Sequence, residues 1–157
     1  MRDERWLHQL LDETWDSYFS DIPQDNIVRI RFGRKAKTRL GSIMVDHKES
    51  DVSIITINGL FRDPEIPDYV IQATIFHELS HYAHGFNSPI KQQHAHPHAG
   101  GVMRTEFSQR GAIKLYKDQK SWLKSHWRGI VLNNFDKKLA KTSVVRKTTK
   151  VPNPFWF

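Results

Sequence analysis

Two histidines and an acid lie close together in the segment His77-Glu78-Leu79-Ser80-His81. On an α-helix, residues four apart lie on one face and one turn apart, so both imidazoles can reach a single metal ion. Glu78 then projects to the side, where its carboxylate can take a proton from a metal-bound water without being a ligand. The spacing indicates zinc beside a general base, as on a metallopeptidase helix. The alternative is a pair of structural histidines satisfied by backbone carbonyls.

The residues around the motif predict a helix from Asp68 to Tyr82. Pro64 and Pro67 precede it, Asp68 can cap its start, and Gly85 follows where a helix commonly ends. The side chains that flank the two histidines are mostly apolar, which predicts a buried helix whose histidines face a cleft. The motif is therefore expected on a helix inside the domain.

Two histidines do not complete a catalytic zinc site, because such a site takes three protein ligands and keeps a fourth position for water. His84 lies on the same helical face, but about 10.5 Å along the axis from His77, so we expect it beside the site or in solvent. A metzincin would have glycine at position 84 and histidine at 87, where this chain has His84 and Asn87, which excludes that subclass. The remaining candidates for the third ligand lie downstream: His94, His96, His98 and Glu106.

With these residues the chain resembles the SprT-like zinc metallopeptidases, or minimal zincins, which include the Spartan proteases that act on DNA-bound proteins. Residues 55–60 are similar to the last strand of that family running into an asparagine turn, and residues 75–81 are similar to its active-site helix. The resemblance covers roughly residues 5–130, and its specific part is the helix motif. It implies a zincin-like fold, Zn²⁺ as cofactor and a protein or peptide substrate. Many members also carry a cysteine zinc ribbon, which this cysteine-free chain cannot form.

In that family the third ligand is a histidine about fifteen residues beyond the helix pair, followed by a small residue and, four positions on, by a bulky apolar residue. His96 suits the distance, whereas the run from His98 to Val102 suits the local pattern. Loop length varies more readily than a helix start, so His98 is favoured over His96 and His94. Glu106 is a further alternative, because a glutamate on a later helix completes the thermolysin-like site. Otherwise Glu106 is an acid that complements the start of a helix.

Length and composition predict one globular domain. A chain of 157 residues with 38% hydrophobic content can bury one substantial core. The absence of cysteine excludes disulfides and a thiol nucleophile. No apolar run approaches the roughly 18 residues of a membrane span, and the first residues lack the apolar core of a secretion signal. We therefore expect a cytoplasmic protein that makes no membrane contact.

The elements expected around the motif give an α+β fold. Apolar residues recur at helical spacing through the first twenty residues, which predicts an N-terminal amphipathic helix. Three strands of a mainly antiparallel sheet are expected at 27–32, 42–46 and 52–57. An exposed edge strand could hold an extended peptide beside the metal. After the motif helix, a long C-terminal helix is expected over 112–130, separated at Gly111 from the shorter helix that bears Glu106.

The charge of the chain favours an acidic partner. The net charge is +7 and the pI is about 9.7, and nucleic acid is the commonest partner of such a protein. Basic residues gather between Arg31 and Arg39 and again after residue 137. We expect a domain over 1–136 and a basic tail over 137–157 that ends in three aromatic residues able to stack on bases. The alternative is a solvated charged surface.

Together these patterns predict a zinc metallopeptidase in which His77, His81 and His98 hold Zn²⁺ and Glu78 takes the proton of the attacking water. DNA-associated proteins are the substrates that the resemblance and the charge favour. Two other functions fit the motif. A DNA-binding protein with a structural metal would close the site with a fourth protein ligand, a further histidine from the 94–98 stretch. A metal-dependent hydrolase, such as a nuclease, would use the same water on a non-protein substrate.

Overall fold

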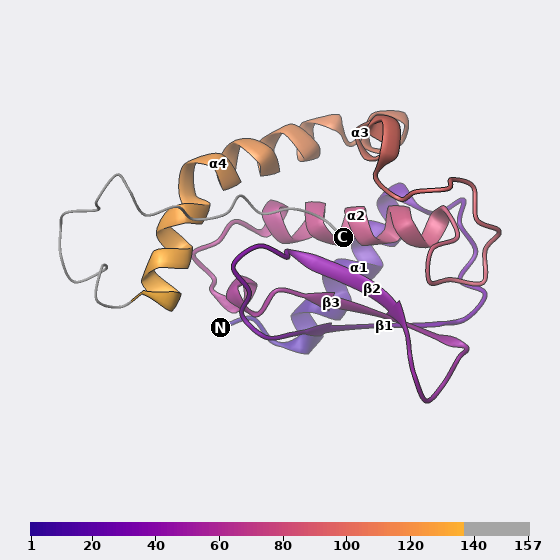
Figure 1. The fold of residues 1–157 in the computed structure, drawn as a ribbon, viewed down its shortest axis with the longest axis horizontal. Helices are drawn as coiled ribbons and strands as arrows, with labels where there is room; N and C mark the ends of the chain where they lie inside the picture. The colour runs from indigo at the N-terminus through magenta and orange to yellow at the C-terminus, as the bar shows by residue number, and fades with distance from the viewer. Residues whose placement is uncertain (137–157) are drawn as a thin grey trace.

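Helices and strands follow one another along residues 1–136, the part of the chain that the computed structural model describes (Figure 1). The predicted basic tail over 137–157 lies outside the described residues. Among the described helices, none is long and apolar enough to cross a lipid bilayer. The elements in chain order are α1 (Glu4–Tyr18), β1 (Ile27–Phe32), β2 (Gly41–Val45), β3 (Val52–Ile57), η1 (Gly59–Arg62), α2 (Asp68–Ala83), η2 (Ala99–Gly101), α3 (Val102–Gln109) and α4 (Ile113–Phe135).

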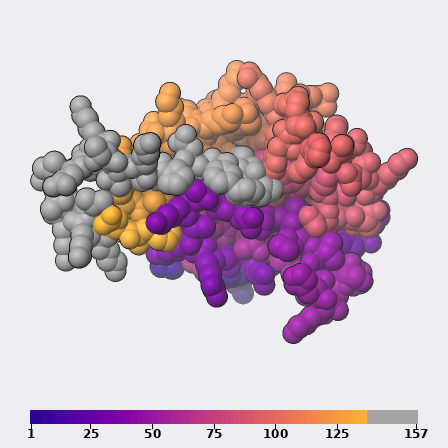
Figure 2. Space-filling model, viewed as in Figure 1, coloured from indigo at the N-terminus to yellow at the C-terminus, as the bar shows by residue number. Residues whose placement is uncertain are grey.

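The sheet is mixed, so the prediction of a mainly antiparallel sheet is wrong. β3 is the central strand, and it pairs in parallel with β1 and antiparallel with β2. Alternating apolar residues indicate where strands lie, but this pattern does not say which strands pair or in which direction. β2 and β3 form a hairpin whose connection, residues 47–51, is exposed and projects from the molecule (Figure 2).

Asn58 ties the connection between β1 and β2 to the end of β3. Its side-chain amide donates to the carbonyls of Ala36 and Arg39, both at 2.8 Å, and its Oδ1 accepts from the backbone N–H of Ala36 at 3.2 Å. The connection from β1 to β2 is therefore held across the end of β3. β2 and β1 lie on opposite edges of β3, with β1 parallel to it and β2 antiparallel.

Helix α2 lies at the centre of the fold, between the sheet and α4 (Figure 1). It begins at the predicted Asp68 and ends one residue beyond the predicted Tyr82, and its residues from Ala73 to Ala83 are all buried. Asp68 does not cap it, because Pro67 takes the N-cap position and the Asp68 carboxylate accepts a hydrogen bond from Arg2. Gly85 follows the helix with a φ of 83°, and a Cβ there would lie 2.5 Å from the backbone of the following loop. Only glycine fits that turn.

The remaining helices enclose α2. α1 packs against β1 and α2, and α4 crosses α2 on the other side. Gln119 of α4 donates its amide to the Val70 carbonyl at 2.9 Å and to the Thr74 hydroxyl at 3.0 Å, so two buried polar groups of α2 find partners. Gly111, with a φ of 74°, separates α3 from α4 as predicted. The described structure is an α+β arrangement in which one buried helix contacts every layer.

Candidate metal centre

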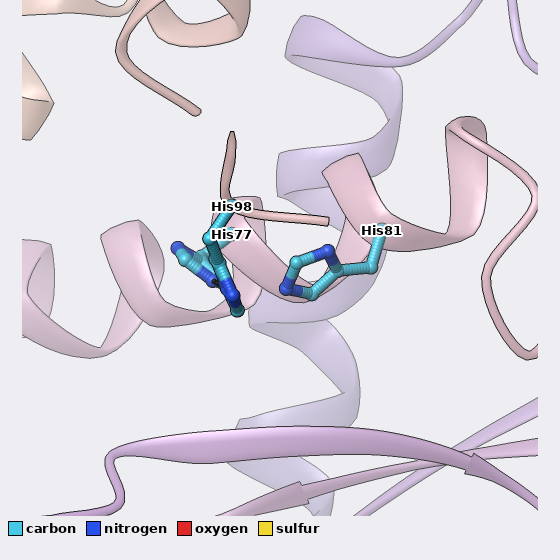
Figure 3. A group of neighbouring side chains, drawn as sticks. All are labelled: His77, His81 and His98. Atoms are coloured by element: carbon cyan, nitrogen blue, oxygen red, sulfur yellow. Dashed lines mark hydrogen bonds between the residues drawn. The ribbon is translucent and has the colours of Figure 1, made fainter. Parts of the chain in front are cut away.

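Three histidines converge on one point beside α2 (Figure 3). His77 and His81 lie one turn apart on α2, and His98 comes from the loop that leads into η2. One ring nitrogen from each lies within 4.8 Å of the others, and the Nε2 atoms of His77 and His98 are 3.0 Å apart. The three side chains are therefore close enough to bind one metal ion.

The geometry of the group fits a tetrahedral metal. Nitrogen ligands of a tetrahedral zinc lie about 3.3–3.5 Å from one another. The ring nitrogens lie within 4.8 Å of one another, so their separations need to change by no more than about 1.5 Å for the three rings to share an ion. His81 is 2% exposed, and neither of its ring nitrogens has a hydrogen-bond partner among the described residues. A buried imidazole without a partner is costly, and a bound cation would remove that cost. Three imidazoles that leave a fourth position free form the donor set of a catalytic metal site.

The surroundings keep these imidazoles in the form that binds metals. Burial lowers the pKa of His77 well below its ordinary value, and the neighbouring charges of His81 and His98 lower it further. Burial, with the charges of His98 and His84, lowers the pKa of His81 to about 3. Burial also lowers the pKa of His98. All three rings are therefore neutral near pH 7 and can offer a lone pair to a cation.

Glu78 is fully buried next to the pair, and neither of its carboxylate oxygens has a hydrogen-bond partner in the described part of the chain. Burial raises the pKa of Glu78 well above its ordinary value, although the charge of Arg39 acts in the opposite direction. The side chain lies against the start of β2, where a Cβ at Gly41 would be 3.1 Å from Glu78 Oε1. An acid with a raised pKa in such a place can accept a proton near neutral pH.

The other candidates for a third ligand lie elsewhere. Glu106 Oε2 accepts from His84 Nε2 at 2.9 Å, and its Oε1 accepts from Arg110 Nε at 2.5 Å. The ring of His94 packs on that of His84, with centroids 4.7 Å apart. His96 is exposed and is not part of the group of three. The structure thus brings His98 to the helical pair and leaves the alternatives outside it.

Sequence reasoning did not identify two features of this region. One is Gly41, whose missing side chain leaves room for Glu78, and no local pattern around it indicates that role. The other is the hydrogen bond between His84 and Glu106, because the sequence analysis considered each residue separately and did not pair them. His84 was expected beside the site or in solvent, and it is 3% exposed and paired with an acid of α3.

Comparison with known proteins finds no family model, no curated protein and no solved structure that matches this chain.

Proposed function

We propose that this chain is a zinc-dependent metallopeptidase of the SprT-like kind, which hydrolyses peptide bonds with an activated water. The observation that carries the proposal is the meeting of His77, His81 and His98 next to the buried acid Glu78. A purely structural metal site would not need a buried carboxylic acid without a hydrogen-bond partner, because burying such an acid costs free energy. The motif spacing supports the same conclusion, since a HExxH helix supplies ligands and base together.

Zinc is the metal that the donor set favours. Imidazole ligands suit zinc, copper, iron and nickel, so the ligand type alone does not select one of them. Three histidines with a free fourth position are the pattern of catalytic zinc, which is commonly tetrahedral. The lowered pKa values of His77 and His81 favour binding, because no proton has to be displaced near neutral pH.

In this proposal the residues of the chain share the work of hydrolysis. A bound zinc ion would make a water acidic and stabilise negative charge on the carbonyl oxygen under attack. Glu78 takes the proton of that water and passes it to the nitrogen of the leaving amine. The raised pKa of Glu78 suits both steps, since the group can hold the proton between them. The apolar surroundings of α2 keep other water away and strengthen these interactions.

The edge of the sheet next to Glu78 is suited to hold a peptide. β2 and β1 are the two edge strands, and β2 is the one whose first residue, Gly41, lies against Glu78. An extended peptide that paired with β2 through main-chain hydrogen bonds would pass beside the site. Met44 and Val45 are exposed on this strand and could contact apolar side chains of the substrate.

We propose DNA-associated proteins as the substrates because of where the positive charge lies. Exposed basic residues occupy β1 and the connection that leads from it to β2. That connection also meets the end of α4, where Lys35 Nζ lies 3.0 Å from Asn134 Oδ1 and Lys37 packs on the Phe135 ring. Further basic residues follow α4 in the sequence, between 137 and 150. The exposed basic residues of β1 and of this connection would bind phosphate groups.

The test is digestion of casein by the purified, zinc-loaded chain, with and without DNA, beside digestion of nucleic acid alone. We expect cleavage of casein that stops with a chelator and returns with zinc. Glu78→Gln keeps the metal ligands and should keep the zinc, but should lower the rate by about 10²–10⁴-fold. Unchanged activity in this variant would refute the role of Glu78.

Two outcomes would favour another function. Cleavage of nucleic acid instead of casein would make the protein a nuclease built on the same water. Metal binding without hydrolysis, together with a fourth protein ligand, would make the metal structural.

A further inference from the structure

A chain of polar contacts links the helix of the metal ligands to α3 and to the end of α1. His84 follows α2 directly, and its Nε2 donates to Glu106 Oε2 at 2.9 Å. The other oxygen of Glu106 accepts from Arg110 Nε at 2.5 Å. Both side chains are largely buried, with 4% of His84 and 13% of Glu106 exposed. We call the set His84, Glu106 and Arg110 the clamp.

Arg110 extends the clamp to the segment after α1. Its Nη1 donates to the Tyr18 carbonyl at 2.8 Å and to Asp21 Oδ1 at 2.7 Å, and its guanidinium lies 4.2 Å from the centre of the Phe19 ring. Burial alone would raise the pKa of Glu106, but hydrogen bonds and charges from His84 and Arg110 bring it below its ordinary value. The carboxylate is therefore ionised near pH 7, and both of its bonds are charge-assisted.

The clamp can affect the metal site through the position of His98. A long loop separates His98 from α2 on one side, whereas on the other side only η2 lies between His98 and α3. Gly100 and Gly101, with φ values of 65° and 71°, form the joint between them. The position of α3 thus determines where the backbone at His98 lies. His98 itself is exposed, and its ring contacts those of His77 and His81.

Apolar packing holds α3 through two buried side chains, Met103 and Phe107. The Phe107 ring stacks on Phe76 of α2, with centroids 3.9 Å apart, and this contact holds α3 to the core. Phe107 also packs on the Tyr116 ring of α4, with centroids 5.1 Å apart, but apolar contacts of this kind do not have the directionality of hydrogen bonds. Hydrogen bonds are directional, so the bonds of Glu106 and Arg110 add the fixed points that a defined orientation needs.

We propose that the clamp positions the third metal ligand: it fixes α3 against α2 and the end of α1, so that His98 faces His77 and His81. This inference rests on the proposed metal site and names how that site is assembled. The clamp residues are positioning residues and bind no metal themselves. A clamp that served stability alone would leave the zinc affinity of the folded protein unchanged.

The test measures zinc affinity by competition with a chelator and the absorption spectrum of the Co²⁺-substituted protein. Glu106→Ala should weaken zinc binding by about tenfold or more, which is the usual effect of losing support around a ligand. Its Co²⁺ spectrum should move toward that of His98→Ala. Glu106→Gln keeps an acceptor for His84 and should lose less. Asp118→Ala removes an acid from the exposed pair with Lys114 on α4, and should change neither quantity.

A double-mutant cycle separates positioning from a general effect. If Glu106 acts through His98, the variant with both residues replaced by alanine binds zinc no more weakly than His98→Ala alone. Additive losses, or wild-type affinity and spectrum in Glu106→Ala, would overturn the proposal. Circular dichroism checks that each variant is folded, and Arg110→Lys, which loses the fork of donors, replaces Glu106→Ala if that variant unfolds.

The result also separates this inference from the proposed function. A wild-type chain that binds zinc through the three histidines but cleaves no peptide would contradict the peptidase assignment, and the cycle would still decide the role of the clamp. A wild-type chain that binds no zinc would overturn both.

Discussion

Glu78 affects both the proposed chemistry and the stability of this protein. It is fully buried, and neither oxygen has a partner among the described residues. Nearly all buried polar groups in folded proteins are paired, so an unpaired acid is a local violation of what stability requires. Such violations are expected where function needs them.

The buried acid predicts how the metal-free protein responds to pH. Burial raises the folded-state pKa of Glu78 above its ordinary value, so its contribution to stability is lost as pH rises above that ordinary value. Metal-free Glu78→Gln should therefore be more stable than the wild type at pH 8, and the difference should shrink toward pH 4.5. Denaturant unfolding in the presence of a chelator, at several pH values, measures this.

The histidines do not disturb that comparison. Their lowered folded-state pKa values act in the other direction, because stability is lost as pH falls below their ordinary value of 6.5. Both proteins share this loss, so it cancels in the difference. An advantage of Glu78→Gln that stays the same from pH 8 to pH 4.5 would contradict the account of Glu78.

At the same scale, sequence predicted the helical ligands better than the loop ligand. His77 and His81 are four residues apart on one helix, so their proximity follows from helical geometry alone. The place of His98 depends on how a loop and a later helix pack, which no local pattern encodes. Glu106 remained an alternative because its partner His84 could not be predicted.

Among the elements, the start of β2 matters most to the site. A Cβ at Gly41 would lie 2.9 Å from Thr74 Cγ2 and 3.1 Å from Glu78 Oε1, which is closer than ordinary contact. Gly41→Ala should therefore destabilise the protein by about 1–3 kcal/mol, as overpacking of a core does. It should also lower peptidase activity while zinc stays bound, because Glu78 has to move.

Gly129 provides the matched control on α4. It is an exposed helical glycine with nothing within 4 Å of the added Cβ. Gly129→Ala should leave activity unchanged and raise stability by up to about 1 kcal/mol, because alanine favours helices. Denaturant unfolding and casein digestion compare the two variants. A Gly41→Ala protein with wild-type stability and activity would show that β2 does not constrain Glu78.

The elements themselves were predicted more fully than their arrangement. The strands at 27–32 and 52–57 lie where the alternation placed them, and the buried motif helix has its predicted start. The direction of pairing was predicted wrongly, because alternation reports burial and not neighbours. It depends on long-range packing, and the contacts of Asn58 with the connection between β1 and β2 are one part of that packing.

In the whole molecule, α2 is enclosed by a mixed sheet and three further helices, and this enclosure gives the site its properties. The sequence predicts a buried helix from its apolar side chains, but it does not show which elements surround it. Burial by those elements lowers the pKa values of the histidines and raises that of Glu78. The electrostatics of the site thus belong to the fold, and the motif alone does not contain them.

The measurement that tests the central claim most directly is the metal content of the purified chain, with its ligands identified by spectroscopy. We predict one zinc ion per chain, held by three nitrogen ligands and one exchangeable water. His98→Ala should lose most of the zinc, whereas His96→Ala and His94→Ala should retain it. A chain without bound metal, a fourth protein ligand, or equal losses in His96→Ala and His98→Ala would contradict the account.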